Sequence, residues 1–358
     1  MAFPAADQAY AEALAAWQQG DAIQAATAAN RACMLEPALP APWFLAGSAL
    51  LDLGELAAAR DAFEQVLALG APFALEHNAR LHAALAAARM DAASGRAMPL
   101  LPMPAVPRER VSVVICSVKP ERFARTSAQY RALLAGVEHE VIAIHDARSL
   151  AEGWTRGLAQ SHGEIVLFSH DDIAIAAPDF AARLLTHLSQ ADLVGIAGAS
   201  RVSHVTWLSA GWPHLHGQVA MPAANGGLVA TVFINDRPTT SGIQAMDGVL
   251  LACRRHVAER VGFDAGTFDG WHLYDFDFSF RAHRAGLRCM VAADLLLVHD
   301  SAGGFGTPDW MTHAQRAMRK FAAELPAMDA MPAQPELYSV ALRDEDEWRR
   351  FSAELLKQ

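Results

Sequence analysis

The stretch 163–173, Gly-Glu-Ile-Val-Leu-Phe-Ser-His-Asp-Asp-Ile, constrains the fold of this chain more than any other. Its run of consecutive apolar residues is typical of a strand buried on both faces, as in a mostly parallel sheet that helices cover. The strand should end where His170, Asp171 and Asp172 begin. Because open α/β sheets bind ligands at the carboxyl ends of their strands, we expect these side chains to line a ligand site.

The segments on either side of this strand alternate between strand and helix patterns. Strands are predicted at 111–116, 140–146, 193–197, 248–253 and 295–299, and helices at 120–134, 149–162, 178–189, 256–261 and 274–285. This alternation predicts right-handed crossovers and a Rossmann-like, doubly wound α/β domain over residues 111–325. Residues 199–246 fit long loops or a hairpin.

Residues 1–95 are predicted to form a separate, all-helical domain. They are rich in alanine, and two segments superpose at a shift of about 34 residues, the period of tetratricopeptide helix-turn-helix repeats. The second copy resembles such a repeat in its large and small residues, which are Trp43, Gly47, Leu50, Gly54, Ala59 and Phe63. Residues 75–90 supply a helix to cap the array. An ordinary alanine-rich helical bundle is the alternative.

Three further segments have no part in the predicted sheet. Residues 96–110 contain four prolines, too many for a helix or a central strand, and are predicted to be a semi-rigid linker. Residues 326–358 are predicted to be a C-terminal helical tail, in which a Pro/Met-rich spacer precedes a charged, solvated helix at 344–357. The glycines of 303–306 make that loop flexible enough to act as a lid.

The charge balance and the cysteines exclude some classes of protein. A formal net charge of -10 argues against a nucleic-acid partner, since proteins that bind nucleic acid usually carry a basic face. The four cysteines lie far apart and are predicted to be reduced core residues rather than disulfides or a zinc site. The sequence lacks a basic and apolar leader and any run of membrane-spanning length, so we expect a cytoplasmic protein with no transmembrane segment.

Three of the predicted strands end in a His-Asp dipeptide, at 145–146, 170–171 and 299–300. One such pair alone is most simply a solvated loop, but the recurrence favours a common edge of the sheet. Carboxylates gathered there repel one another unless a cation or a proton shares the site. Mg²⁺ and Mn²⁺ are commonly held by one or two carboxylates together with substrate phosphates. We therefore predict a divalent cation that holds a phosphorylated ligand, with Asp172 as principal ligand and His299 and Asp171 as further candidates.

A second acidic segment lies at 270–281, where Asp275 and Asp277 alternate with phenylalanines at the start of a predicted helix. The simplest interpretation is an acidic N-terminus favoured by the helix dipole. The functional interpretation places Asp275 at the mouth of a pocket, where aromatic neighbours raise its pKa into the range of a general base. Four residues of this segment are predicted to lie on the acceptor side, namely Trp271, His272, Tyr274 and Asp277.

Several short motifs, taken in order and spacing, make residues 111–306 similar to a known family. They are Val113-Val-Ile-Cys-Ser-Val, Ser149-Leu-Ala-Glu, Gly163-Glu with His170-Asp171-Asp172, Asp247-Gly248, Tyr274-Asp275-Phe276-Asp277 and Leu297-Val-His299. The chain resembles the inverting GT-A glycosyltransferases of family 2, and especially a bacterial branch whose metal motif reads His-Asp-Asp. The resemblance implies a GT-A fold for this domain.

The resemblance also implies roles for individual residues. Asp172 takes the place of the last aspartate of the metal motif, His170 stands where the first aspartate is usual, and His299 completes the metal site. Asp275 takes the place of the catalytic base. Contacts with the nucleotide are implied for Ser117, Asp146, Asp171 and Asp247.

Together these features predict a metal-dependent enzyme that moves a sugar, with inversion, from a nucleotide-diphosphate sugar to a hydroxyl acceptor. Mn²⁺ or Mg²⁺ is the expected cofactor, and the acceptor is expected to be a saccharide, a lipid-linked group or a protein. The helical repeats are expected to recruit a protein partner or the acceptor. Two alternatives stay open: a metal-dependent phosphoester hydrolase, and a non-catalytic repeat scaffold with a degenerate transferase domain.

Overall fold

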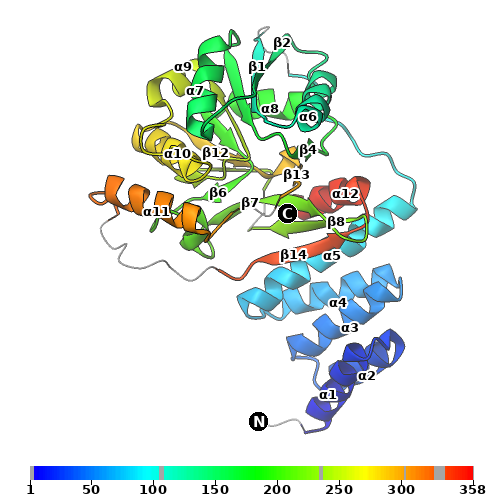
Figure 1. The fold of residues 1–358 in the computed structure, drawn as a ribbon. Coiled ribbons are helices and arrows are strands. Elements are labelled where there is room, and N and C mark those ends of the chain that lie inside the picture. The colour runs from blue at the N-terminus through cyan, green and yellow to red at the C-terminus, as the bar shows by residue number, and fades with distance from the viewer. Residues whose placement is uncertain (1–3, 105–108, 234–236, 302–303, 326–334, 358) are drawn as a thin grey trace. The chain divides into compact units, whose positions relative to one another are not determined.

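The computed structural model describes residues 4–104, 109–233, 237–301, 304–325 and 335–357. The chain forms two compact units (Figure 1), one of Met1–Met98 with Leu342–Gln358 and the other of Pro99–Ala341. Parts of the predicted linker, lid and spacer, at 105–108, 302–303 and 326–334, lie outside the described residues. The first unit is helical, and the second contains the sheets.

Five successive helices build most of the described part of the first unit. They are α1 (Pro4–Gln18), α2 (Ala22–Leu35), α3 (Pro40–Asp52), α4 (Leu56–Ala68) and α5 (Phe73–Ala93). Alanine, the best helix former, supplies much of each helix. Gly20 and Gly54 follow α1 and α3 with φ of 77° and 80°, a conformation that glycine adopts without steric cost. Each helix packs against the next, which confirms an all-helical N-terminal region.

Small residues let these helices approach one another closely. The ring of Phe63 lies 2.8 Å from the position that a Cβ would take at Gly47, so a larger residue there would displace the ring. Ala25, Ala29 and Ala59 are fully buried. The pairs α1 with α2 and α3 with α4 correspond to the two sequence copies, and their assignment as tetratricopeptide repeats stays a prediction.

The last helix, α12 (Glu345–Leu355), packs against α5 in the same unit. Its Trp348 and Phe351 are fully buried, and its Glu347 pairs with Arg89 of α5 at 2.8 Å. The prediction of a solvated helix is therefore wrong. Exposed charged residues such as Glu345 and Asp346 suggested it, but they lie on the outer face of an amphipathic helix whose apolar face is covered.

We expect Phe351→Ala to lower the free energy of unfolding by about 3–5 kcal/mol, because the substitution empties a fully buried aromatic site. Glu345→Ala is the matched control, since Glu345 is exposed on the same helix, and it should change that free energy by no more than about 0.5 kcal/mol. Urea unfolding followed by circular dichroism measures both. Equal effects of the two substitutions would contradict the packing of α12.

The first sheet of the second unit has the strand order β2-β1-β3-β11-β5-β12-β9. Its strands are β1 (Val111–Cys116), β2 (His139–Ile144), β3 (Ile165–Ser169), β5 (Leu193–Gly195), β9 (Thr239–Ser241), β11 (Leu250–Arg254) and β12 (Cys289–Ala292). Strands β2, β1 and β3 are parallel, as predicted, and every residue of β3 is buried. Strand β11 runs antiparallel to both β3 and β5, so the sheet is mixed.

A second sheet includes much of 199–246, for which the sequence predicts loops or a hairpin. Its strands are β4 (Ile173–Ile175), β6 (Ala197–Ala199), β7 (Leu215–Pro222), β8 (Leu228–Val232), β10 (Ala245–Met246), β13 (Leu297–His299) and β14 (Tyr338–Leu342). Strands β7 and β8 form the hairpin, and β14 pairs with β8. The expectation of a purely helical C-terminal tail is therefore wrong for β14, which is apolar at alternate positions and buried on one face.

Helices follow the strands of the second unit (Figure 1). They are α6 (Pro120–Leu133), α7 (Leu150–Gln160), α8 (Phe180–Leu188), α9 (Arg255–Val261), α10 (Tyr274–Arg284) and α11 (Pro308–Lys320). Ser149 caps α7 as predicted, its Oγ accepting from Glu152 N at 3.1 Å. Gly157 brings α7 directly onto β1, because a Cβ there would lie 2.1 Å from Val114. Among the described residues, every helix is too short or too polar to cross a bilayer.

Candidate functional site

A cleft of about 420 Å³ lies where β1 and β3 end and α10 begins. Residues of β13, α11 and the segment 205–208 complete its walls. Its volume falls in the range of small-ligand sites, about 300–1,000 Å³. The cleft brings together most of the acidic residues that the sequence singles out, namely Asp171, Asp172, Asp247 and Asp275.

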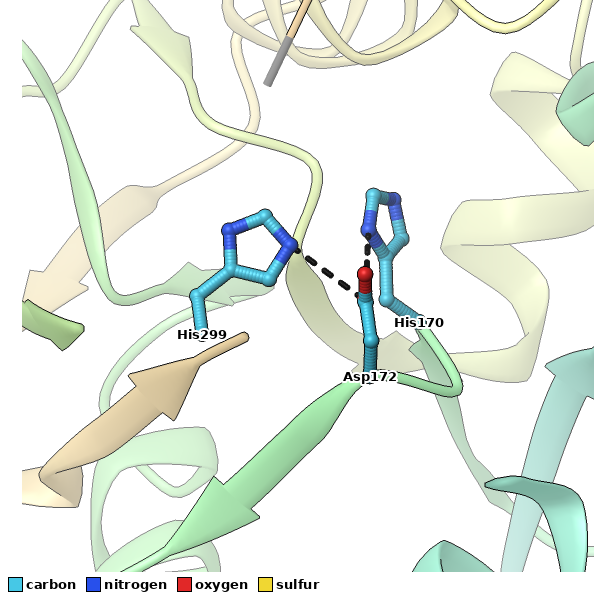
Figure 2. Close-up of side chains that lie close together, drawn as sticks. All are labelled: His170, Asp172 and His299. Carbon is cyan, nitrogen blue, oxygen red and sulfur yellow. Dashed lines mark ion pairs between the residues drawn. The ribbon is translucent and has the colours of Figure 1, made fainter. Parts of the chain in front are cut away.

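His170, Asp172 and His299 form a compact group in this cleft, here called the His/Asp cluster (Figure 2). Asp172 Oδ1 lies 3.3 Å from His299 Nε2 and 3.8 Å from His170 Nδ1. One ligand atom from each residue lies within 4.8 Å of the other two, as expected of side chains that share one cation. Within the described ranges it is the one group of His, Cys, Asp and Glu with this property.

Two short antiparallel strands place the cluster. Asp172 directly precedes β4, and His299 ends β13 opposite Ile173 of β4. Asp300 N donates to the carbonyl oxygen of Asp172 at 2.8 Å and extends this pairing by one step. The register of β4 and β13 therefore sets the distance between Asp172 and His299. His170 comes from the other sheet, at the end of β3.

The charges in the cluster support one another. Burial opposes ionisation of Asp172, but the hydrogen bond and positive charge of His299 hold the pKa of that carboxyl well below its ordinary value. Burial also disfavours the charged form of His299. The hydrogen bond and negative charge of Asp172 outweigh this effect of burial, so the pKa of His299 is raised. For His170 burial prevails and lowers the pKa, which keeps the imidazole neutral at neutral pH, the form that binds metals.

Asp275 lies in the first turn of α10 and lines the same cleft. Its Oδ2 accepts a hydrogen bond from Gly248 N at 2.9 Å. Burial and the charge of Asp247 raise the pKa of Asp275 to about 7, although backbone hydrogen bonds oppose them. A carboxylate with this pKa can accept a proton near neutral pH. The sequence did not reveal that Asp247 contributes to the shift.

Backbone geometry holds Asp275 in place. Leu273, just before α10, has φ 61° and ψ 1°, a left-handed conformation rare for a branched side chain. Such strain persists where the surrounding packing imposes it, commonly at functional sites. A Cβ at Gly248 would lie 2.5 Å from Asp275 Cβ and 2.7 Å from Tyr274 Oη. Gly248 is therefore required for the start of α10 to lie against this turn.

We expect Gly248→Ala to lower the free energy of unfolding by about 1–3 kcal/mol, the cost of overpacking a filled site. Gly266→Ala is the matched control, because the nearest atom to its added Cβ is Asp264 Oδ1 at 3.5 Å. That control should stay within about 0.5 kcal/mol of the unsubstituted protein. Urea unfolding measures both changes, and a fully stable Gly248→Ala variant would contradict the close approach of α10.

A second pocket of about 240 Å³ adjoins the cleft and shares Cys116, Asp171 and Trp271 with it. Ser117 Oγ donates to Asp171 Oδ2 at 2.6 Å. Arg122 brings a positive charge, 3.4 Å from Asp172 Oδ2 and 3.8 Å from Asp171 Oδ1. A guanidinium beside carboxylates suits an anionic ligand that binds together with a cation.

Three of the predicted acceptor-side residues line the cleft. Trp271 is 46% exposed, and His272 Nε2 lies 3.6 Å from Asp309 Oδ2. Tyr274 is buried, with its Oη 2.7 Å from His170 Nε2. Tyr274 therefore contacts the His/Asp cluster directly.

The assignment of Asp277 to the acceptor side is wrong. Its side chain is fully buried outside the cleft lining and forms ion pairs with Arg281 at 2.6 Å and Lys320 at 2.5 Å. A residue two positions after Asp275 in a helix points about 200° away from it around the axis. The alternating pattern Asp-Phe-Asp-Phe therefore places its two carboxylates on opposite sides of α10.

The dipeptide His145-Asp146 also lies away from the His/Asp cluster. Asp146 is exposed, outside the lining of both pockets, and pairs with Arg156 at 2.6 Å. His145 Nδ1 lies 2.8 Å from the carbonyl oxygen of Ser117. Because β2, β1 and β3 are parallel, this pair does lie at the same edge of the first sheet as His170-Asp171, but β1 separates the two pairs. The prediction that all three pairs share one edge is wrong for His299-Asp300 instead, because β13 belongs to the second sheet.

Several residues of the site could not be identified from the sequence. Arg122 lies in an ordinary amphipathic helix, where an arginine carries no signal of its own. Gly248 occurs in a motif, but its steric role depends on α10, which follows much later in the chain. Three further aromatic residues of the cleft wall, Trp207, Phe305 and Trp310, lie in segments where the sequence predicts loops or shows no motif.

Fold and site together define a class of protein. The fold is that of a GT-A glycosyltransferase domain: a mixed α/β sheet with carboxylates and imidazoles gathered in a cleft at its strand ends. The chain belongs to the glycosyltransferase like family, whose family model matches residues 112–323. A search of curated proteins finds no match.

Some solved structures are distantly similar. The mannosyltransferase PcManGT from Pyrobaculum calidifontis, in complex with GDP-Man and Mn²⁺, is 15% identical over 85% of this chain and 81% of that chain, with a TM-score of 0.38. GalNAc-T7 with UDP, GalNAc and Mn²⁺ is 14% identical over 69% of this chain and 54% of that chain, with a TM-score of 0.38. Similarities this weak add nothing to what the family match shows.

Proposed function

We propose that this chain is a metal-dependent, inverting glycosyltransferase that moves a sugar from a nucleotide-diphosphate sugar to a hydroxyl group. Membership of the family supports the reaction class. The mechanism rests on one observation: Asp275, with a pKa of about 7, lines the same cleft as the His/Asp cluster. Transfer to a hydroxyl needs a base at the acceptor and positive charge at the leaving group, and this cleft offers a place for each.

The donor atoms of the His/Asp cluster fit a divalent transition metal. Two imidazole nitrogens and one carboxylate oxygen suit Mn²⁺ better than Mg²⁺, which prefers oxygen ligands throughout. Asp172, whose depressed pKa keeps it ionised, would supply the negative charge, and His170 and His299 the nitrogens. When bound, such a cation would stabilise the charge that grows on the diphosphate leaving group.

Asp275 is the proposed general base. Its carboxylate takes the proton of the acceptor hydroxyl while that oxygen bonds to the anomeric carbon of the donor sugar. The bond from the anomeric carbon to the nucleotide diphosphate breaks on the opposite face, so a single displacement inverts the configuration. Gly248 N fixes the orientation of the carboxylate through its bond to Oδ2. The carboxylate is then already oriented for proton transfer, which favours a fast reaction.

The second pocket is the proposed site of the nucleotide. Ser117 and Asp171 lie in its wall, and Asp247 lies in the adjoining cleft. Arg122 is positioned to contact the diphosphate, because it lies between this pocket and Asp172. The exposed position of Asp146 gives no support to a role for it in base recognition.

The helical unit is proposed to recruit a protein partner or the acceptor. Stacked helix pairs present extended surfaces that suit this task. The acceptor hydroxyl is proposed to belong to a saccharide, a lipid-linked group or a protein, and the site of action to be the cytoplasm. Pull-down with the full chain, followed by a transfer assay on whatever is bound, tests this assignment.

A thermal-shift screen of UDP, GDP, CDP and dTDP, with and without Mn²⁺, tests the proposed function. We expect one nucleotide to raise the unfolding temperature, and to do so only with Mn²⁺ present. The matching nucleotide sugar is then offered with candidate acceptors, and proton NMR of the product reports the anomeric configuration. A retained configuration would refute the single displacement, and sugar release that no acceptor accelerates would indicate a hydrolase.

A further inference from the structure

A partly buried hydrogen bond joins the His/Asp cluster to the helix that carries Asp275. Tyr274 Oη lies 2.7 Å from His170 Nε2. Tyr274 is the first residue of α10 and directly precedes Asp275, whereas His170 follows β3. The bond therefore links the two parts of the site, the proposed base and the proposed cation ligands.

We propose that Tyr274 is a positioning residue that selects the tautomer of His170 able to bind the cation, an inference that rests on the proposed function. A neutral imidazole carries a proton on one nitrogen and a lone pair on the other. His170 Nδ1 is the atom that faces Asp172, so Nδ1 must keep its lone pair to act as a ligand. The proton then resides on Nε2, which donates it to the oxygen of Tyr274.

The distances favour this tautomer over the other. If Nδ1 carried the proton, its closest carboxylate oxygen, Asp172 Oδ1, would lie 3.8 Å away, too far for a hydrogen bond. The same distance is suitable between two atoms that bind one ion. Tyr274 can accept this hydrogen bond because its phenol oxygen carries lone pairs.

Packing fixes the hydroxyl of Tyr274 in this position. Trp154 of α7 meets the Tyr274 ring edge-on, with centroids 5.0 Å apart and an angle of 89° between the planes. Trp154 also contacts His170, with ring centroids 6.3 Å apart. The other side is closed by Gly248, where a Cβ would lie 2.7 Å from Tyr274 Oη. The ring has no room to turn away, so its oxygen is a fixed acceptor for His170.

The test is the Mn²⁺ affinity of the nucleotide-free protein, measured by electron paramagnetic resonance of free Mn²⁺. Tyr274→Phe removes only the hydroxyl and should weaken binding about 10- to 100-fold, the usual effect of losing such a partner. In a His170→Ala background the same substitution should have no further effect, because the hydroxyl acts through His170. Unchanged affinity in the single variant, or equal losses in both backgrounds, would overturn the inference.

A matched control separates this role from a general effect on packing. Tyr130 is also fully buried, and its Oη donates to Ser169 Oγ at 2.9 Å outside the cleft lining. Tyr130→Phe removes a hydroxyl of the same kind and should leave Mn²⁺ affinity unchanged. An equal loss of affinity in this control would overturn the assignment to Tyr274.

A measurement on the unsubstituted protein covers the case in which Tyr274→Phe does not fold. Long-range proton-nitrogen NMR spectra of the metal-free protein report the tautomer of each neutral histidine, and the signal of His170 is identified by its loss in His170→Ala. We expect the proton on Nε2, and a proton on Nδ1 would overturn the inference. If the unsubstituted protein binds no Mn²⁺, the proposed metal dependence fails as well. If it binds and Tyr274→Phe binds equally well, this inference alone fails.

Discussion

Replacing Asp275 by asparagine should lower the rate of sugar transfer by about 10²-fold or more, the scale of a general-base contribution. Asparagine has the same shape, and its oxygen can still accept from Gly248 N, but it cannot take a proton from the acceptor. Binding of Mn²⁺ and of the nucleotide diphosphate should stay unchanged. Single-turnover kinetics measures the rate and calorimetry the binding. Full turnover in this variant would remove Asp275 from the role of base.

The same residue fixes the expected pH dependence. Because only the ionised form of Asp275 accepts a proton, kcat/KM should rise with pH through the pKa of about 7, and the asparagine variant should lack this step. The folded pKa lies above the ordinary value of 3.8, so the folded state binds this proton more tightly than the unfolded chain. Between these two values stability falls as the pH rises. At pH 8 Asp275→Asn should therefore unfold at a higher temperature than the unsubstituted protein.

Asp172→Ala should weaken Mn²⁺ binding by more than the roughly 10- to 100-fold loss that follows removal of an outer partner. Asp172 is the one carboxylate of the His/Asp cluster, and its Oδ1 lies near both histidines. Without it, the two imidazoles have no negative charge to share. Nucleotide binding that depends on Mn²⁺ should disappear with the metal. Calorimetry with the nucleotide found in the thermal-shift screen, with and without Mn²⁺, measures both effects.

Asp300→Asn is the control for this prediction. Asp300 follows His299 directly, but its side chain is exposed, lies outside the cleft lining and pairs with Arg125 at 3.5 Å. Removing its charge should leave Mn²⁺ binding unchanged, since surface charges are screened by water and salt. Equal losses in the two variants would indicate a diffuse electrostatic effect instead of a ligand, and intact Mn²⁺ binding in Asp172→Ala would place the metal elsewhere.

Much of the α/β unit could be predicted because its elements carry strong local patterns. Strand β3 ends at Ser169, just before His170, as the change in polarity indicates, and Ser149 marks the start of α7. The direction of β11 could not be predicted, because it depends on the path taken by residues 199–246 between neighbouring strands. Likewise β4 has three residues, too few to show a period.

In the candidate site, too, some residues could be predicted from the sequence and others could not. Asp172 and His299 could be named from sequence because each follows or ends an apolar strand. Asp277 could not be placed correctly from the sequence. The direction of its side chain depends on its position around the helix, and its partner Lys320 lies 43 residues further along the chain. The contribution of Asp247 to the pKa of Asp275 is also non-local, since the two carboxylates meet only when α10 packs against the turn at Gly248.

The pairing of β4 with β13 has a consequence for the local stability of these two strands. Each strand has only three residues, so the ladder between them offers few hydrogen bonds against local opening. An ion bound by Asp172 and His299 would link two segments that are remote along the chain. Folded protein that binds this ion gains stability by mass action. Binding of the donor and the ion would then reduce local opening of these strands. The rate of amide hydrogen exchange in β13 therefore reports whether donor and ion are bound.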